Sequence, residues 1–147
     1  MNNSTLNEPE KVICSACLLG YNCRYDGKSK PEKKVMSLAL EKVLIPICPE
    51  QLGGLSTPRV PSEIQGEKVI SREGVDVTAR FEHGAGEVLK LANLMGCKKA
   101  ILKQRSPSCG SGQIYDGTFS GNVIKGDGIT TKLMKLNGIE VITEEDL

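Results

Sequence analysis

Short apolar runs alternate with segments of helical periodicity along this 147-residue chain, and this alternation limits the folds that are open to it. Four runs have the length of buried strands, KVICSA, VLIPIC, KKAILK and IEVIT, at residues 11–16, 43–48, 98–103 and 139–143. Three segments carry helical spacing or helix boundary residues, at 31–43, 79–96 and 129–138. Strands that alternate with helices predict a mainly parallel sheet with helices on both faces.

The predicted fold is a single Rossmann-like, three-layer α/β domain over residues 10–147, preceded by a flexible tail at residues 1–9. A small β-hairpin insertion is expected at residues 68–78, with its turn at Glu73-Gly74. Pro46 places strand 43–48 at an edge of the sheet or beside a bulge. The Pro- and Gly-rich segment 49–66 predicts a long loop, and a loop of this length in a compact domain is usually functional.

Composition argues against several classes of partner. The net charge of +1 gives no overall field that would attract nucleic acid, and with 3% aromatic residues and no Trp, stacking on single-stranded nucleic acid has little support. No apolar run reaches the roughly 18 residues of a membrane span, and MNNSTLNEPE lacks the order of a secretion signal. We therefore expect a cytoplasmic protein with no membrane partner. In that reducing compartment its six cysteines are better interpreted as thiols than as disulfides.

Three of these cysteines follow predicted strands. Cys17 comes just after the first strand, Cys48 ends the second, and Cys109 lies in the bend RSPSCGSG that follows the third. Ligands of open α/β sheets bind beyond the carboxyl ends of the strands, so these thiols are expected to converge at one edge. Soft thiolate ligands suit an iron–sulfur cluster, and three ligands would leave one iron open to substrate.

The remaining cysteines allow a different interpretation. CSACLLGYNC can be read as a C-x2-C-x5-C zinc site formed by Cys14, Cys17 and Cys23, although a strand through the first two would point them to opposite faces. Cys14 and Cys97 fit core packing better. His83, the one histidine, falls at the start of a helix and is expected on the surface. A thiol nucleophile at this edge would therefore have no histidine partner.

Polar residues near the predicted thiols have both functional and ordinary interpretations. Glu50 could act as a general acid or base, or be a solvated loop residue. Ser106 and Ser108 could bind substrate or cap a turn, and Asp26 could orient a ligand or make a turn with the glycine after it. Arg59, between two prolines, could bind an anion or pair with an acidic side chain.

Four segments of the chain together resemble the DUF523 family, which includes the thiouracil desulfurases. They are SACLLGYNCRYDG, CPEQLGGLSTPR, LKQRSPSCGSG and YDGTFSG, at residues 15–27, 48–59, 102–112 and 115–121. The resemblance implies a Rossmann-type domain that holds a 4Fe-4S cluster through Cys17, Cys48 and Cys109 and leaves the fourth iron without a protein ligand. It further implies non-redox hydrolysis of a thiolated base such as 2-thiouracil to the oxo base and hydrosulfide.

The resemblance also assigns roles to residues around the cluster. Glu50 corresponds to the acidic residue proposed to handle protons, and Ser106 to the serine proposed to contact substrate. We take Glu50 and Ser106 as the predicted catalytic residues, and Ser108, Asp26 and Arg59 as the predicted substrate-binding residues.

Two other functions remain open from the sequence. One is a desulfidase acting on thiouridine in RNA, for which Lys98, Lys99, Lys103 and Arg105 could contact phosphates; the near-neutral chain makes an RNA partner the less favoured hypothesis. The other is a zinc- or cluster-binding module without turnover. The favoured partner is a small-molecule thiolated nucleobase.

Overall fold

A four-stranded parallel sheet organises the computed structural model, which describes residues 8–147. The strand order is β2-β1-β5-β8, with bounds Val43–Ile47, Lys11–Ser15, Lys99–Leu102 and Glu140–Thr143. β2 lies at an edge and carries Pro46 opposite Cys14, which confirms the expected edge position. Most of the tail predicted at residues 1–9 lies outside the described residues.

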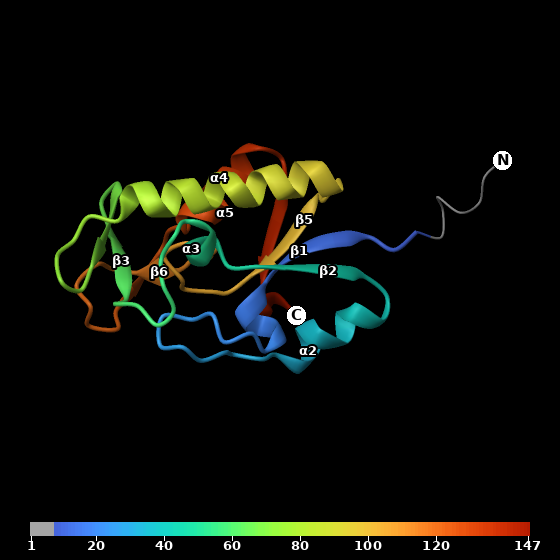
Figure 1. Cartoon of the computed structure of the whole chain (residues 1–147), viewed down its shortest axis with the longest axis horizontal. Helices are drawn as coiled ribbons and strands as arrows, with labels where there is room; N and C mark the ends of the chain where they lie inside the picture. Colours follow the sequence, from blue (N-terminus) through green and yellow to red (C-terminus); the bar gives the residue numbers. More distant parts are fainter. Residues whose placement is uncertain (1–7) are drawn as a thin grey trace.

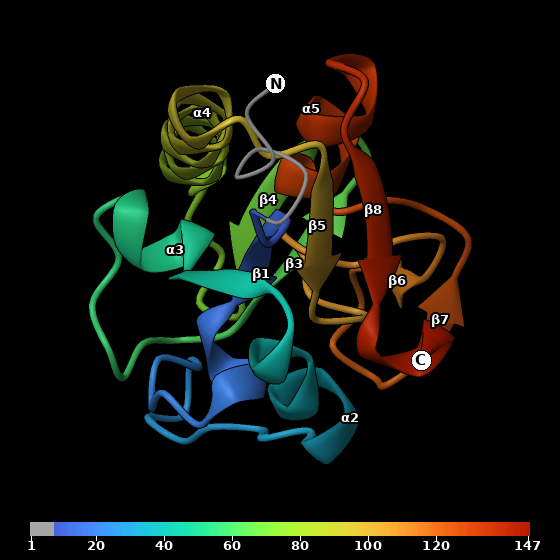
Figure 2. The same ribbon diagram turned by 90° about the vertical axis from the view of Figure 1, so that its right-hand side faces the viewer.

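Helices cover both faces of this sheet, as Figures 1 and 2 show. α4 (Thr78–Met95) and α5 (Ile129–Leu136) lie on one face, and the short helices η1 (Ala16–Leu19), α2 (Lys33–Met36) and η2 (Ser37–Leu40) lie on the other. Each face of the sheet has its own hydrophobic core, and the side chains of β1 alternate between the two. Ile13 packs under α4, whereas Val12 and Cys14 pack toward α2. The predicted three-layer α/β architecture is confirmed.

Two small antiparallel hairpins extend the molecule beyond the carboxyl ends of the strands. One pairs β3 (Ser62–Gln65) with β4 (Lys68–Ser71), and the other pairs β6 (Ile114–Tyr115) with β7 (Val123–Ile124). β3 and β6 lie at the same end of the molecule in Figure 1. Two further short helices are α3 (Pro49–Leu52) and η3 (Glu144–Asp146). None of the helices within residues 8–147 is both long and apolar enough to cross a membrane.

Three predicted elements differ from the structure. The segment predicted as a loop at 49–66 contains α3 at its start and β3 near its end. The helix expected at 31–43 is broken into α2 and η2, because only Val35 is fully buried and the hydroxyl of Ser37 donates to the carbonyl of Lys34, 2.9 Å away. The hairpin turn falls at Gly66, where φ is 65°, rather than at Glu73-Gly74. The chain still turns at Glu73-Gly74, where a single antiparallel β-bridge pairs Ile70 with Asp76.

Candidate functional site

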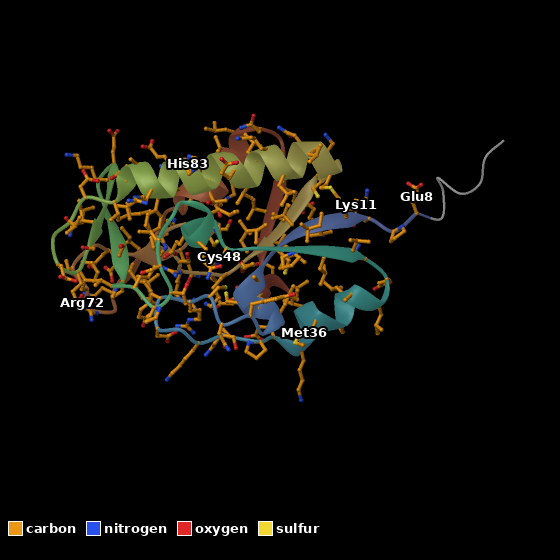
Figure 3. All side chains as sticks on the ribbon, in the orientation of Figure 1. Glu8, Lys11, Met36, Cys48, Arg72 and His83 are labelled. Atoms are coloured by element: carbon orange, nitrogen blue, oxygen red, sulfur yellow. The ribbon has the colours of Figure 1, made fainter. Side chains whose placement is uncertain are left out.

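The three predicted ligand cysteines follow three adjacent strands of the sheet. Cys17 lies in η1 directly after β1, Cys48 is the N-cap residue of α3 directly after β2, and Cys109 lies in the bend after β5. Because β1 lies between β2 and β5, their carboxyl ends bring all three thiols to one cavity of about 330 Å³. Figure 3 labels Cys48 beside α3, below α4.

The thiols are buried or half-buried and have few protein partners. Cys109 is 4% exposed, and its sulfur accepts a hydrogen bond from the hydroxyl of Ser15 at 3.6 Å. Burial raises the pKa of Cys109 to about 12, with a further contribution from the charge of Cys48. The pKa of Cys48 is also raised, first by its hydrogen bond with Cys23 and then by burial. Both thiols therefore stay protonated at neutral pH in the absence of bound metal, although the Arg59 guanidinium lies 4.0 Å from Cys48 Sγ.

Cys23 is a fourth thiol of this cavity, which sequence reasoning did not place with the other three. It is 5% exposed, it lines the cavity, and its backbone carbonyl accepts a hydrogen bond from the Cys48 thiol at 3.6 Å. The sequence signal that could have placed Cys23 here is its position in the loop after β1, because that loop starts at the same edge of the sheet. Cys14 does not line the cavity and packs in the core toward α2, as expected.

The geometry gives no support to a site for one metal ion. Within residues 8–147, no three His, Cys, Asp or Glu side chains converge as ligands of a single ion. In an iron–sulfur cluster each cysteine binds a different iron, so the sulfur atoms need not share one ion. His83 lies on the exposed surface of α4, with its side chain 64% exposed and 3.5 Å from Glu87 (Figure 3). The expected surface position of His83 is confirmed.

A chain of hydrogen bonds leads from the cysteine bend to Glu50. The Ser108 hydroxyl donates to Glu50 Oε2 at 3.0 Å, so Ser106 is the donor in the 3.1 Å contact between the two serine hydroxyls. Ser106 Oγ accepts from the backbone N–H groups of Ser108 and Cys109, both at 3.1 Å. Ser106 therefore caps the bend, and the two hydroxyls direct their protons toward the Glu50 carboxylate.

Arg59 holds the other oxygen of that carboxylate. Its Nε donates to Glu50 Oε1 at 2.9 Å, and its Nη2 donates to the carbonyl of Cys23 at 2.9 Å and lies 4.0 Å from Cys48 Sγ. Nη1 donates to the carbonyl of Ser56 and the hydroxyl of Thr57. The side chains of Arg59 and Glu50 are only 7% and 16% exposed, so this ion pair is largely shielded from solvent.

Asp26 is the one predicted site residue that does not line the cavity. Its Oδ1 accepts from the backbone N–H of Lys28 at 3.0 Å, and its Oδ2 lies 3.8 Å from Arg24. It therefore closes a turn, while its neighbours Arg24 and Tyr25 line the cavity. The other predicted site residues all line the same cavity, namely Cys17, Cys48, Glu50, Arg59, Ser106, Ser108 and Cys109.

Comparisons with known proteins agree with this arrangement. The protein YbbK of Bacillus subtilis, described as uncharacterized, is 43% identical in an alignment 146 residues long, which covers 92% of this chain and 97% of that protein. The solved structure of the [4Fe-4S]-dependent thiouracil desulfidase TudS is 48% identical, with a TM-score of 0.89 over 94% of this chain and 93% of that chain. The model of the 2-thiouracil desulfurase family matches residues 12–146. The chain therefore belongs to the 2-thiouracil desulfurase family.

Proposed function

We propose that this protein is an iron–sulfur cluster-dependent desulfidase that removes sulfur from a thiolated pyrimidine resembling 2-thiouracil. The products are the oxo base and hydrosulfide, formed by hydrolysis without net redox change. The observation that carries the proposal is that the thiols of Cys17, Cys48 and Cys109 line the same cavity as Glu50. Membership of the 2-thiouracil desulfurase family and similarity to a [4Fe-4S]-dependent desulfidase support it.

Cys17, Cys48 and Cys109 would hold a 4Fe-4S cluster. The donor set fits, because these clusters are bound by cysteine thiolates and the three thiols follow adjacent strands. The raised pKa values of Cys48 and Cys109 also fit, since bound iron would take the place of protons on buried sulfur. When bound, a cluster with three protein ligands supplies a Lewis-acidic iron that polarises a thiocarbonyl group and makes its sulfur a better leaving group.

Glu50 is the proposed general base. It would accept the proton of the water that attacks the thiocarbonyl carbon and return it as the sulfur leaves. Ser108 and Ser106 are proposed to orient the carboxylate and to carry hydroxyl groups within reach of the substrate's ring nitrogens and oxygen. Their hydrogen-bond chain to Glu50 supports this arrangement.

Arg59 is proposed to act on the substrate mainly through Glu50. A guanidinium group has five N–H donors, and the five contacts of Arg59 with other groups of the protein already occupy them. Asp26 is proposed to serve substrate binding through the turn that brings Tyr25 to the cavity.

The test is anaerobic reconstitution of the full chain with iron and sulfide, followed by measurement of hydrosulfide released from 2-thiouracil. We expect hydrosulfide and uracil in equal amounts. Glu50→Gln should retain the brown cluster absorption and lose about 10²- to 10⁴-fold in kcat, the usual contribution of a general base. Arg59→Lys keeps the charge but not the forked donors, so we expect a loss of about tenfold with iron retained.

Two outcomes would contradict the proposal. A fully reconstituted protein that releases no hydrosulfide would instead indicate a cluster-binding module without turnover. Full activity of Glu50→Gln would remove Glu50 from the mechanism. Glu87→Gln is the matched control, since Glu87 lies on α4, near His83 and away from the cavity.

A further inference from the structure

Aromatic residues gather at the cavity, although the chain has few of them. The sequence contains three Tyr, two Phe and no Trp. Tyr25, Tyr115 and Phe119 line the cavity, whereas Phe81 is buried in the core and Tyr21 is 56% exposed. Aromatic side chains offer flat faces on which the rings of bases stack.

Phe119 is held in an unfavourable backbone conformation. It lies in the loop between β6 and β7 and has a φ of 57°, which residues with a Cβ seldom adopt. Glu63 of β3 holds this loop, because its Oε1 accepts from the backbone N–H groups of Gly117 at 3.0 Å and Phe119 at 3.1 Å. Gly117 permits the close approach, since a Cβ there would lie 2.7 Å from the carbonyl oxygen of Ile64. Such strained residues concentrate at binding sites.

Arg72 completes this part of the cavity wall. Its guanidinium carbon lies over the ring of Phe119, 5.5 Å from the ring centroid, and both side chains line the cavity. Figure 3 shows Arg72 toward the end of the molecule where β3 lies, while Cys48 lies nearer the sheet. The same cavity therefore joins the thiols to a flat, positively charged wall.

We propose that Phe119, supported by Arg72 and Glu63, determines specificity by stacking on the planar ring of the substrate. This inference rests on the proposed desulfidase function and specifies the class of thiocarbonyl compound that the site selects. A planar heteroaromatic thioamide presents a π face to this wall, whereas a puckered, saturated ring does not. The site then selects the aromatic ring in addition to the carbon–sulfur bond.

The experiment compares 2-thiouracil with 5,6-dihydro-2-thiouracil, which keeps the thiocarbonyl group and both ring nitrogens but has a puckered ring. We expect Phe119→Leu to lower kcat/KM for 2-thiouracil by about tenfold, mainly through KM, because stacking on a base contributes about 1–3 kcal/mol. The same variant should change kcat/KM for the dihydro compound by less than about threefold. Phe119→Tyr should retain the selectivity of the wild type.

Controls separate stacking from general damage. Glu63→Gln should weaken selectivity in the same direction, because a neutral amide holds the Phe119 loop less firmly than a carboxylate. Val123→Ala, at an exposed site on the same hairpin and outside the cavity lining, should leave both substrates unaffected. Equal losses for the two substrates in Phe119→Leu, or no loss for either, would overturn the proposal.

A binding measurement distinguishes this proposal from the proposed function. Equilibrium dialysis of the reconstituted protein with uracil and 5,6-dihydrouracil requires no turnover. We expect tighter binding of uracil by the wild type and loss of that preference in Phe119→Leu. If no hydrosulfide forms but the preference is present, the catalytic function fails and the stacking wall stands. If hydrosulfide forms and the preference is absent, the stacking wall fails alone.

Discussion

Cys23 reaches the cavity from a loop. Of the three proposed cluster ligands, Cys17 and Cys48 directly follow strands, and Cys109 lies in the bend after β5. The pKa of the Cys23 thiol is raised to about 11, mainly by its contact with Cys17. A thiol in this place can hold its neighbours in position without binding iron itself. Its backbone carbonyl does so already, because it accepts from both Arg59 and the Cys48 thiol.

We therefore expect Cys23→Ser to keep close to the wild-type content of iron and acid-labile sulfide after anaerobic reconstitution. Cys17→Ser, Cys48→Ser and Cys109→Ser should each lose most of both, because two thiolates cannot retain a cubane cluster. Cys14→Ser is the matched control, a buried thiol outside the cavity. Loss of iron in Cys23→Ser as complete as in Cys48→Ser would make Cys23 a ligand.

At the scale of elements, the contact between α3 and α4 positions Cys48 and Glu50. A Cβ on Gly84 of α4 would lie 1.9 Å from the carbonyl oxygen of Pro49, and a Cβ on Gly53 would lie 2.1 Å from that of Arg80. The two backbones are therefore in direct contact, which only glycine permits at these positions. Because Cys48 is the N-cap residue of α3, the packing of α3 on α4 fixes the direction of the second ligand.

Gly84→Ala should force α3 away from α4. We expect a loss of about 1–3 kcal/mol in the free energy of unfolding, as for other overpacked sites, together with reduced iron content. Gly86→Ala is the control on the same helix, since a Cβ there meets nothing within 4 Å. That variant should gain about 0.5–1 kcal/mol, because alanine favours a helix more than glycine does. Urea unfolding of both variants measures the difference, and equal stability would contradict the assigned contact.

The sequence could predict the part of the site that follows the ends of the strands. Apolar runs place strand termini within one or two residues, and parallel strands share an edge, so Cys17, Cys48 and Cys109 could be brought together without coordinates. Elements without such a pattern were harder to place. The segment at 31–43 has helical spacing but buries little, so tertiary packing does not stabilise one long α-helix there and two short helices form instead.

Contacts within loops could not be predicted from the sequence. The pairing of Arg59 with Glu50 was one of two interpretations of an arginine between prolines, and only the path of the chain decides between them. The approach of Phe119 to the cavity depends on Glu63, which lies more than fifty residues earlier in the chain. The Glu63 carboxylate accepts a hydrogen bond from the backbone N–H of Phe119. Such contacts join distant loops through single hydrogen bonds, which leave no periodic signal in the sequence.

At the scale of the whole molecule, the placement of charge favours a small substrate over RNA. Lys98 and Lys99 lie at the amino end of β5, at the opposite edge of the sheet from the cavity. Lys103 is paired with Glu144 at 3.0 Å, and Arg105 is paired with Glu145. The four basic residues that could contact phosphates are therefore either far from the cavity or paired with a glutamate beside it. The net charge of the whole chain is only +1.

This placement predicts weak dependence on salt. A protein that contacts 6–10 phosphates loses about 10³- to 10⁵-fold in affinity between about 50 and 200 mM salt. We expect kcat/KM for 2-thiouracil to change by less than about twofold over that range, because few counterions are released when a neutral base binds. Thiouridine-containing tRNA should bind only with the affinity of non-specific contacts. A steep salt slope, with hydrosulfide released faster from tRNA than from the free base, would make RNA the substrate.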